Sequence, residues 1–303
     1  MSQVDKLLLL GVDGGGTQCR ARLAKADGVV LGEGLAGPAN IRLGLQDGLA
    51  TVRAAADQCL QQAGLGYGDC RIIACLALAG ACEPVSLAQA LAVPLPFWRT
   101  TLTSDARAAC VGAHAGGDGG IVIVGTGSVG LAIAAGKDYR VGGGGFPVSD
   151  EGSGAWLGCE ALRRVLWAHD GLVPCTSVLR SLFERFAGDG YAIVRWMDGA
   201  HPRDYASLAP TVVAHVGVGD AMAVELVQQA ATHIDAIAAK LLACAAVPRL
   251  CIMGGLAEGI LPFLSPRTQR SLVPPLGDAL SGALHLACAE ARCHHSLSVQ
   301  AHG

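Results

Sequence analysis

The fold is decided by residues 7–34, which read LLLLGVDGGGTQCRARLAKADGVVLGEG. The stretch begins with an apolar run and continues through a glycine-rich turn at Asp13–Thr17. In the next segment, Gln18–Lys25, polar and apolar residues alternate, which is the period of a β-strand. The glycine turn therefore leads from one strand into another. A third strand follows the short polar turn at Ala26–Gly28.

The same pattern recurs at residues 121–143, which read IVIVGTGSVGLAIAAGKDYRVGG. Segments with helical spacing of apolar residues follow each of the two repeats. Alternation of strands and helices indicates the α/β class, and the duplicated start predicts two similar domains with a cleft between them. The expected helices are Asp47–Ala63, Ala106–Ala113, Glu151–Ala168, Tyr205–His215, Asp220–Ala246 and Leu280–Cys293. Further strands are expected at Arg99–Thr103 and Arg249–Met253, and a loop at Asp198–Asp204.

The composition is that of a chain with a large core. Hydrophobic residues make up 51% of the chain and charged residues 16%. A length of 303 residues suits two domains. A net charge of -3 gives no footprint for nucleic acid. The apolar run Ile72–Cys82 is too short to cross a membrane, and the N-terminus lacks the apolar core of a signal peptide, so we expect a cytoplasmic protein. The twelve cysteines include no C-x-x-C pair and are expected mainly as small hydrophobes.

Glycine turns after buried strands are frequent phosphate sites, because bare backbone can approach oxygen closely. The chain has no G-x-x-x-x-G-K-[ST] string, and a dinucleotide fingerprint should open a helix rather than a strand. Two hairpin tips, one per domain, would instead hold a triphosphate from both sides of the cleft. Simple tight turns are the alternative, which the matching positions disfavour. Asp13 would then hold Mg²⁺ through water, and Thr17 and Thr126 would offer hydroxyls to phosphate.

Five motifs occur in order along the chain: GVDGGGT (11–17), TSDA (103–106), VGTGS (124–128), GGF with DEGSGAWLG (144–158) and IMGG (252–255). Together they resemble the BadF/BadG/BcrA/BcrD ATPase family, and within it the N-acetylglucosamine and glucosamine kinases. The resemblance implies a two-domain actin-like (ribonuclease H-like) fold with duplicated βββαβα domains and an interdomain cleft that closes. It implies domains at 1–113, joined by a C-terminal helix at about 278–303, and at 114–277. ATP and Mg²⁺ are the implied cofactors, with nucleotide contacts at Gly14, Gly15, Gly16, Thr17, Thr126, Gly127, Ser128, Gly254 and Gly255.

Asp105 lies where the expected strand Arg99–Thr103 gives way to the helix Ala106–Ala113. By resemblance it is the base that takes the proton from the 6-hydroxyl of the sugar, as a kinase acting on a hydroxyl requires. The alternative is that Asp105 is the N-cap of that helix. The two roles are compatible.

Other sugar contacts follow from the resemblance alone. Asn40 would contact the sugar, although an Asn after Gly-Pro-Ala is also a common turn residue. Asp150 would accept a sugar hydroxyl, with Gly144 and Gly145 lining the pocket, although acidic residues before a helix also complement its dipole. The link between Gly145 and Asp150 is shorter than in many relatives, which leaves the substituent read at the C2 atom of the sugar open.

The resemblance predicts phosphorylation of N-acetylglucosamine at its 6-hydroxyl, or of glucosamine. Two alternatives remain. The family also contains ATPases that activate acyl-CoA dehydratases and reductases and use paired cysteines to bind an iron–sulfur cluster. In this chain no second cysteine is evidently placed to pair with Cys159. A sugar sensor that has lost its chemistry is disfavoured by the presence of Asp13, Asp105 and both loops. Relatives are often dimers, so a homodimer is left open.

Overall fold

The computed structural model describes residues 6–42, 44–244, 247 and 249–300, and the chain divides into two compact units. Unit 1 comprises Met1–Gly117 and Pro274–Gly303, and unit 2 comprises Asp118–Val273. The chain thus leaves unit 1 once and returns to it near the C-terminus. The expected boundaries at 113/114 and 277/278 lie close to these positions. Each unit is built on its own β-sheet.

The sheet of unit 1 has the strand order β3-β2-β1-β4-β5. The first three strands form an antiparallel meander, and β1, β4 and β5 run parallel to one another. The glycine turn joins two strands, so this prediction is confirmed. The strands are β1 (Leu7–Gly14), β2 (Cys19–Lys25), β3 (Val30–Ala36), β4 (Arg71–Leu78) and β5 (Arg99–Ser104).

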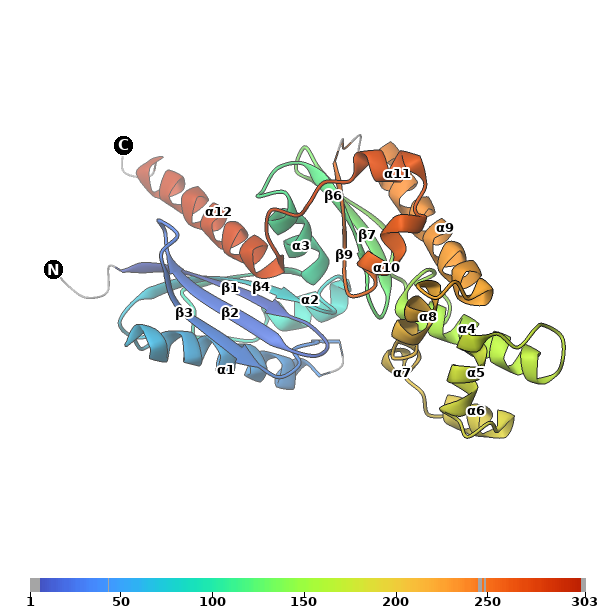
Figure 1. The fold of residues 1–303 in the computed structure, drawn as a ribbon. Coiled ribbons are helices and arrows are strands. Elements are labelled where there is room, and N and C mark those ends of the chain that lie inside the picture. The colour runs from blue at the N-terminus through green and yellow to red at the C-terminus, as the bar shows by residue number, and fades with distance from the viewer. Residues whose placement is uncertain (1–5, 43, 245–246, 248, 301–303) are drawn as a thin grey trace. The chain divides into compact units, whose positions relative to one another are not determined.

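Helices cover both faces of this sheet (Figure 1). Alternate residues of β1 point to opposite faces: Leu8 and Leu10 belong to the cluster that packs on α1 (Leu45–Ala63), and Leu9 to the cluster that packs on α3 (Asp105–Ala113) and α12 (Ala279–Gln300). Helix α2 (Pro84–Leu91) connects β4 to β5. The apolar run that begins at Ile72 forms β4, a buried central strand of this sheet.

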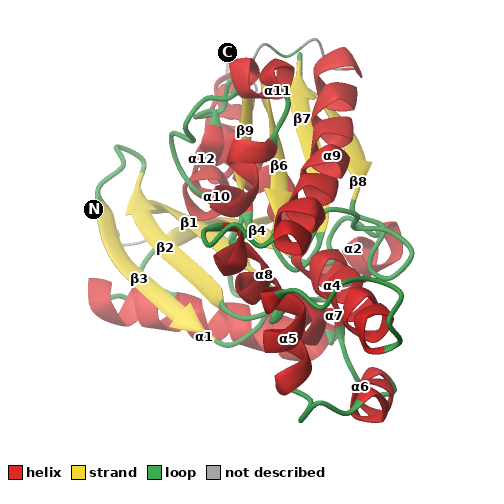
Figure 2. Ribbon diagram, turned by 45° about the vertical axis from the view of Figure 1, so that its right-hand side comes forward, coloured by secondary structure: helices red, strands yellow, loops and turns green. Residues whose placement is uncertain are grey.

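The sheet of unit 2 has the strand order β8-β7-β6-β9. Figure 2 shows these strands side by side, with α9 (Ala221–Cys244) crossing one face. Again three strands form an antiparallel meander, and β9 adds parallel to β6. The duplicated three-stranded start is therefore present in both units. The strands are β6 (Gly119–Val124), β7 (Ser128–Ala134), β8 (Lys137–Gly142) and β9 (Leu250–Met253).

A group of helices lies between β8 and β9 in the chain, and it shares one core with the sheet of unit 2. Buried Val122 of β6, Leu157 and Val212 belong to the same hydrophobic cluster as Ile234 of α9. The helices before α9 are α4 (Gly154–His169), α5 (Ser177–Glu184), α6 (Gly190–Met197), α7 (Pro202–Ala206) and α8 (Ala209–Val216). Those after β9 are α10 (Ala257–Ile260), the 3₁₀ turn η2 (Leu261–Phe263) and α11 (Pro266–Ser271).

Three sequence predictions need correction in this helical region. The helix expected from Glu151 begins only at Gly154, because the preceding turn takes left-handed backbone at Asp150 and Gly152. The helix expected over Tyr205–His215 is two helices, α7 and α8. Pro210, in the first turn of α8, lacks the N–H that would continue α7, so a new helix starts there. The loop expected up to Asp204 ends at His201, since α7 begins at Pro202.

Expected α9 residues 245 and 246 lie outside the described part of the chain. Within that part, no single helix is long and apolar enough to span a membrane. The segments 202–216 and 221–244 reach that length and hydropathy only together, across a bend of 118°.

Candidate functional site

The carboxyl ends of three parallel strands meet at one edge of the sheet of unit 1. Gly14 of β1 is aligned with Leu78 of β4, and Leu78 with Ser104 of β5. The residues next to these positions, Asp13 and Asp105, therefore come to the same edge although 92 positions separate them in the sequence. Ligands of open α/β sheets bind outside the carboxyl ends of the strands. The register thus brings the predicted magnesium carboxylate and the predicted base to one edge.

The first glycine turn is held by the backbone around it. Gly14 O accepts a hydrogen bond from Ala79 N at 2.7 Å, and Gly15 O accepts one from Ala39 N at 2.9 Å. A Cβ atom on Gly14 would lie 2.6 Å from Leu78 Cδ2, so packing requires glycine there. A Cβ atom on Gly16 would meet nothing within 4 Å. Gly16 and Thr17 are exposed, so this end of the turn is open to a ligand.

Asn40 lies on a loop that is tied to the same edge. Ala39 bonds to the glycine turn, and Ile41 N donates to Ala79 O at 3.1 Å. The side-chain oxygen of Asn40 accepts a hydrogen bond from Arg42 N at 3.1 Å, which is the turn role considered for it. The amide nitrogen of Asn40 points to no acceptor among the described residues. The turn role and a sugar contact by that nitrogen are therefore compatible.

Asp13 is paired with a residue that the sequence analysis did not single out. Arg20 lies opposite Asp13 in the β1–β2 hairpin and contacts its Oδ2 through Nε at 3.2 Å and Nη2 at 2.6 Å. The Nη1 atom of the same guanidinium donates to Asp278 Oδ2 at 2.8 Å. Burial tends to raise the pKa of Asp278, but hydrogen bonds from Ser281 and the charge of Arg20 lower it below its usual range.

The N-cap of α3 is Ser104, whose Oγ accepts a hydrogen bond from Arg107 N at 3.1 Å. Asp105 is the first residue of the helix, and its Oδ1 accepts a hydrogen bond from Ala106 N at 2.8 Å. The N-cap interpretation of Asp105 is therefore wrong: the capping role belongs to its neighbour. Asp105 places its carboxylate in the first turn of α3, at the positive end of the helix dipole.

In unit 2, the second glycine turn lies against the start of α4. Gly125 O accepts a hydrogen bond from Gly154 N at 2.8 Å, and Thr126 O accepts one from Ala155 N at 3.1 Å. The Thr126 side chain is exposed. The Ser128 hydroxyl is buried and donates to Glu151 O at 2.8 Å, so it holds the turn before α4. Thr126 is thus the residue of this loop that presents a hydroxyl.

Asp150 packs directly on this loop. A Cβ atom added to Gly127 would lie 2.4 Å from Asp150 Oδ2, so glycine is needed for the carboxylate to reach its position. Its other oxygen accepts a hydrogen bond from Gly145 N at 3.2 Å, and Gly144 N is bonded to Ser149 Oγ. Burial raises the pKa of Asp150, and backbone N–H donors offset only part of that rise. The predicted sugar residues of unit 2 therefore form one cluster with the glycine turn.

The third glycine pair follows β9, next to the end of β6. Gly254 has left-handed backbone (φ 104°), and a Cβ atom on it would lie 2.3 Å from Val124 O. Leu256 N donates to that same carbonyl at 3.1 Å. Gly255 is exposed, and a Cβ atom there would meet nothing. Since Gly125 follows Val124 directly, two of the predicted nucleotide loops of unit 2 converge.

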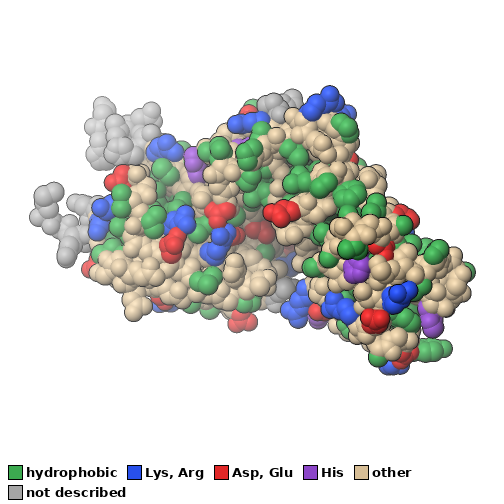
Figure 3. All heavy atoms as spheres, viewed as in Figure 1, with side chains coloured by type: hydrophobic (Ala, Val, Ile, Leu, Met, Phe, Trp, Pro, Cys, Tyr) green, Lys and Arg blue, Asp and Glu red, His purple; other side chains and the backbone are tan. Residues whose placement is uncertain are grey.

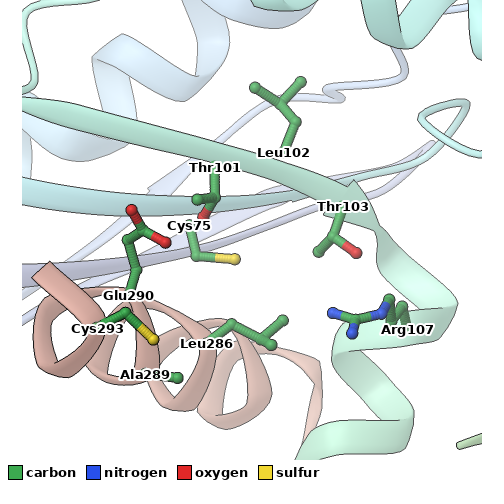
Figure 4. A pocket seen from close by; sticks show the side chains of 9 residues that line it. All are labelled: Cys75, Thr101, Leu102, Thr103, Arg107, Leu286, Ala289, Glu290 and Cys293. Carbon is green, nitrogen blue, oxygen red and sulfur yellow. The ribbon is translucent and has the colours of Figure 1, made fainter. Parts of the chain in front are cut away.

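A separate pocket of about 410 Å³ lies between β5, α3 and α12 in unit 1 (Figure 4). Figure 4 shows Thr103 and Arg107 toward one end, and Glu290 and Cys293 on the α12 side. The lining residues include Cys75 and Thr101 but none of the residues predicted for the site.

A family model for the BadF/BadG/BcrA/BcrD ATPase family matches residues 10–271. The chain belongs to that family. A glucosamine kinase from Vibrio cholerae is 42% identical over 279 residues, which is 92% of this chain and 95% of the relative. The structure of a protein from Chromobacterium violaceum, provisionally named an N-acetylglucosamine kinase, is 34% identical and covers 94% of this chain and 99% of its own, with a TM-score of 0.85. A glucokinase of the ROK family from Streptomyces griseus, at 17% identity and a TM-score of 0.53 over 94% of this chain and 99% of its own, shares the fold. The fold is thus the two-unit actin-like ATPase fold.

In this BadF/BadG/BcrA/BcrD family member, Asp13 is the predicted ligand for Mg²⁺. Within the described residues, no group of three or more His, Cys, Asp or Glu side chains could enclose a metal ion. Mg²⁺ in kinases is usually held by one or two carboxylates, phosphates and waters, so a single hard oxygen ligand such as Asp13 fits. Arg20 occupies Oδ2 of Asp13, and Oδ1 accepts no hydrogen bond from the described residues.

Arg20 and Asp278 are the members of the site that sequence reasoning missed. A hairpin signal for Arg20 existed, since a four-residue turn between β1 and β2 places it across from Asp13. No local signal in the sequence connected Asp13 or Arg20 to Asp278, which is 258 positions from Arg20.

Proposed function

We propose that this chain is an amino sugar kinase that transfers the γ-phosphoryl group of Mg²⁺–ATP to the 6-hydroxyl of glucosamine. The observation that carries the proposal is the alignment of β1, β4 and β5, which brings Asp13, the open end of the glycine turn and Asp105 to one sheet edge. A phosphate loop and a carboxylate base at one edge are what phosphoryl transfer to a hydroxyl requires.

Each residue has a role that its surroundings allow. Asp105 takes the proton of the attacking 6-hydroxyl, and Asn40 and Asp150 bind other groups of the sugar. Asp13 would hold Mg²⁺, and the turns at Gly14–Thr17 and Thr126–Ser128 would bind the phosphates. Mg²⁺ would neutralise charge on the phosphates. Gly144 and Gly145 line the sugar pocket, and Gly254 with Gly255 borders the adenosine.

The choice between glucosamine and N-acetylglucosamine rests on similarity. The relative at 42% identity across nearly the whole chain is named a glucosamine kinase, and this favours the free amine over the acetylated sugar that the motifs first suggested. N-acetylglucosamine is the second candidate, because the protein at 34% identity carries that provisional name.

The test is ADP release from Mg²⁺–ATP in the presence of glucosamine, N-acetylglucosamine, glucose or 6-deoxyglucosamine, with the product position read by ³¹P–¹H NMR. Glucosamine should give the highest kcat/KM, and 6-deoxyglucosamine should give no turnover. A higher kcat/KM for N-acetylglucosamine would reverse the substrate assignment. Absence of stimulation by any sugar would overturn the kinase proposal. An iron–sulfur absorbance after anaerobic purification would then favour the activator role. Cys159 of α4, which is partly exposed, would be the candidate cluster ligand.

A further inference from the structure

One guanidinium in unit 1 connects the glycine turn with the point where the chain returns from unit 2. Arg20 contacts Asp13 with two nitrogens and Asp278 with the third. The Asp13 side chain is only 18% exposed. Two carboxylates share one cation, so the three side chains together carry one net negative charge beside the turn. In the space-filling view, acidic and basic side chains stand next to one another on the face of unit 1 that is turned to the viewer (Figure 3).

Asp278 is itself held firmly in place. Its Oδ1 accepts hydrogen bonds from Ser281 N at 3.0 Å and Ser281 Oγ at 2.8 Å, so it caps the start of α12. The backbone just before it is bound to α3, because Leu276 N donates to Ala113 O at 3.0 Å. A Cβ atom on Gly112 would lie 2.0 Å from Asp278 O, so α3 and the start of α12 touch through their backbones. Asp278 is therefore a fixed anchor for Arg20.

We infer that Arg20 is a positioning residue for the metal–nucleotide complex, acting through Asp13, an inference that rests on the proposed function. Because Arg20 occupies Oδ2 of Asp13, Oδ1 is the carboxylate oxygen that would hold the metal. The anchor on Asp278 fixes the guanidinium, and thereby the carboxylate, against rotation. Removal of a contact that orients a metal ligand typically lowers metal affinity or activity about 10–100-fold, and we expect an effect of about that size here.

An ordinary exposed ion pair contributes little, and the same strand provides one for comparison. Arg22 lies two residues along β2 and pairs with Glu33 of β3 through Nη2 at 2.6 Å. Like Arg20, Arg22 is an arginine of β2 that pairs with a carboxylate. Its partner Glu33, however, lies on the edge strand β3 and not at the glycine turn. Arg22→Gln is therefore a matched control for Arg20→Gln.

The experiment measures the affinity of the whole chain for ADP by calorimetry, with Mg²⁺ and with EDTA, for the wild type, Arg20→Gln, Arg20→Lys and Arg22→Gln. The measured quantity is the gain in ADP affinity that Mg²⁺ provides. Arg20→Gln should reduce that gain about tenfold, whereas the EDTA value should stay near the wild type. Arg20→Lys should restore part of it, since a single ammonium keeps the charge but cannot contact both carboxylates with a fork. Arg22→Gln should keep the full gain.

Asp278→Asn tests the anchor without removing the helix cap, because Asn caps helices as well as Asp. It should reduce the metal-dependent gain less than Arg20→Gln. The double variant should then behave like Arg20→Gln alone, because both changes break one network. Thermal unfolding of each variant checks that the fold is intact.

An unchanged metal-dependent gain in folded Arg20→Gln would overturn the inference, and so would an equal loss in Arg22→Gln. A larger gain in Arg20→Gln would also overturn it, because Arg20 would then compete with the metal. ADP binding needs no sugar turnover. Failure of every sugar to stimulate ADP release would therefore sink the proposed function while this result still stood.

Discussion

Gly254 approaches the carbonyl oxygen of Val124 so closely that a Cβ atom would lie 2.3 Å from it. This contact places the turn after β9 on the end of β6, next to the second glycine turn. Gly254 also has left-handed backbone, which a side chain disfavours. Gly255 has neither constraint, although both glycines were predicted for the same nucleotide loop.

Gly254→Ala is therefore expected to destabilise unit 2 by about 3 kcal/mol, through overlap and backbone strain together. Gly255→Ala should change the free energy of unfolding by less than about 0.5 kcal/mol, because its Cβ atom would enter open space. Urea unfolding followed by circular dichroism measures both. Equal stability of the two variants would contradict the close approach.

Two glutamines cover the outer edge of β3, one of the two edge strands in the sheet of unit 1. Gln58 exchanges two hydrogen bonds with the backbone N–H and C=O of Leu35, and Gln62 does the same with Glu33. An uncovered strand edge is a template for pairing with another chain. The Gln58→Ala/Gln62→Ala variant should lose about 1–2 kcal/mol in unfolding free energy and should self-associate, as seen by light scattering. Gln61→Ala, an exposed glutamine of the same helix, is the control and should stay as dispersed as the wild type. A double variant that is no more associated than this control would refute the edge-covering role.

Asp220 joins two helices of unit 2 and should make its stability depend on pH. Its oxygens accept hydrogen bonds from Ser177 Oγ and Val178 N of α5, and from Met222 N and Ala223 N of α9. Burial would raise the pKa of Asp220, but these hydrogen bonds outweigh it and lower the pKa to about 2.

A carboxylate whose pKa is lower in the folded state stabilises the fold when the pH lies above its unfolded-state pKa. Asp220 should thus contribute about 2 kcal/mol at neutral pH, and this is lost as the pH falls from about 4 toward 2. In Asp220→Asn, the stability difference from the wild type should shrink over that interval. Unfolding free energies measured between pH 7 and pH 2.5 check this, and a difference independent of pH would contradict it.

The sequence was sufficient for the repeated meanders and for the glycine turns, because alternation and turn residues are local signals. It also named Asp13 and Asp105, which the strand register brings to one edge of the sheet of unit 1: Asp13 lies at the end of β1 beside the glycine turn, and Asp105 directly follows β5. What it could not supply depends on contacts distant in the chain. The Arg20–Asp278 link needs the return of the chain to unit 1, and the position of Asp150 against Gly127 depends on a left-handed turn that no periodicity reveals.

Short helices were the other gap. Helices α2, α5 and α6 span eight residues each, too few for a periodic pattern to stand out from a loop. The end of α7 and the start of α8 were merged because both carry apolar residues at compatible spacing. The alternative interpretation of Asp105 as the α3 N-cap overlooked Ser104, the preceding residue, whose type also favours N-caps.

The most direct test of the central claim uses that pair. Because Ser104 caps α3 and Asp105 does not, Asp105→Asn removes the base without removing the cap, and Ser104→Ala does the reverse. The measurement is kcat for ADP release with glucosamine, beside ADP affinity and unfolding free energy. Asp105→Asn should lower kcat by about 10²–10⁴-fold while ADP still binds, and Ser104→Ala should lose about 1 kcal/mol of stability but keep most of its turnover. Near-normal turnover by Asp105→Asn would contradict the assignment of Asp105 as the catalytic base.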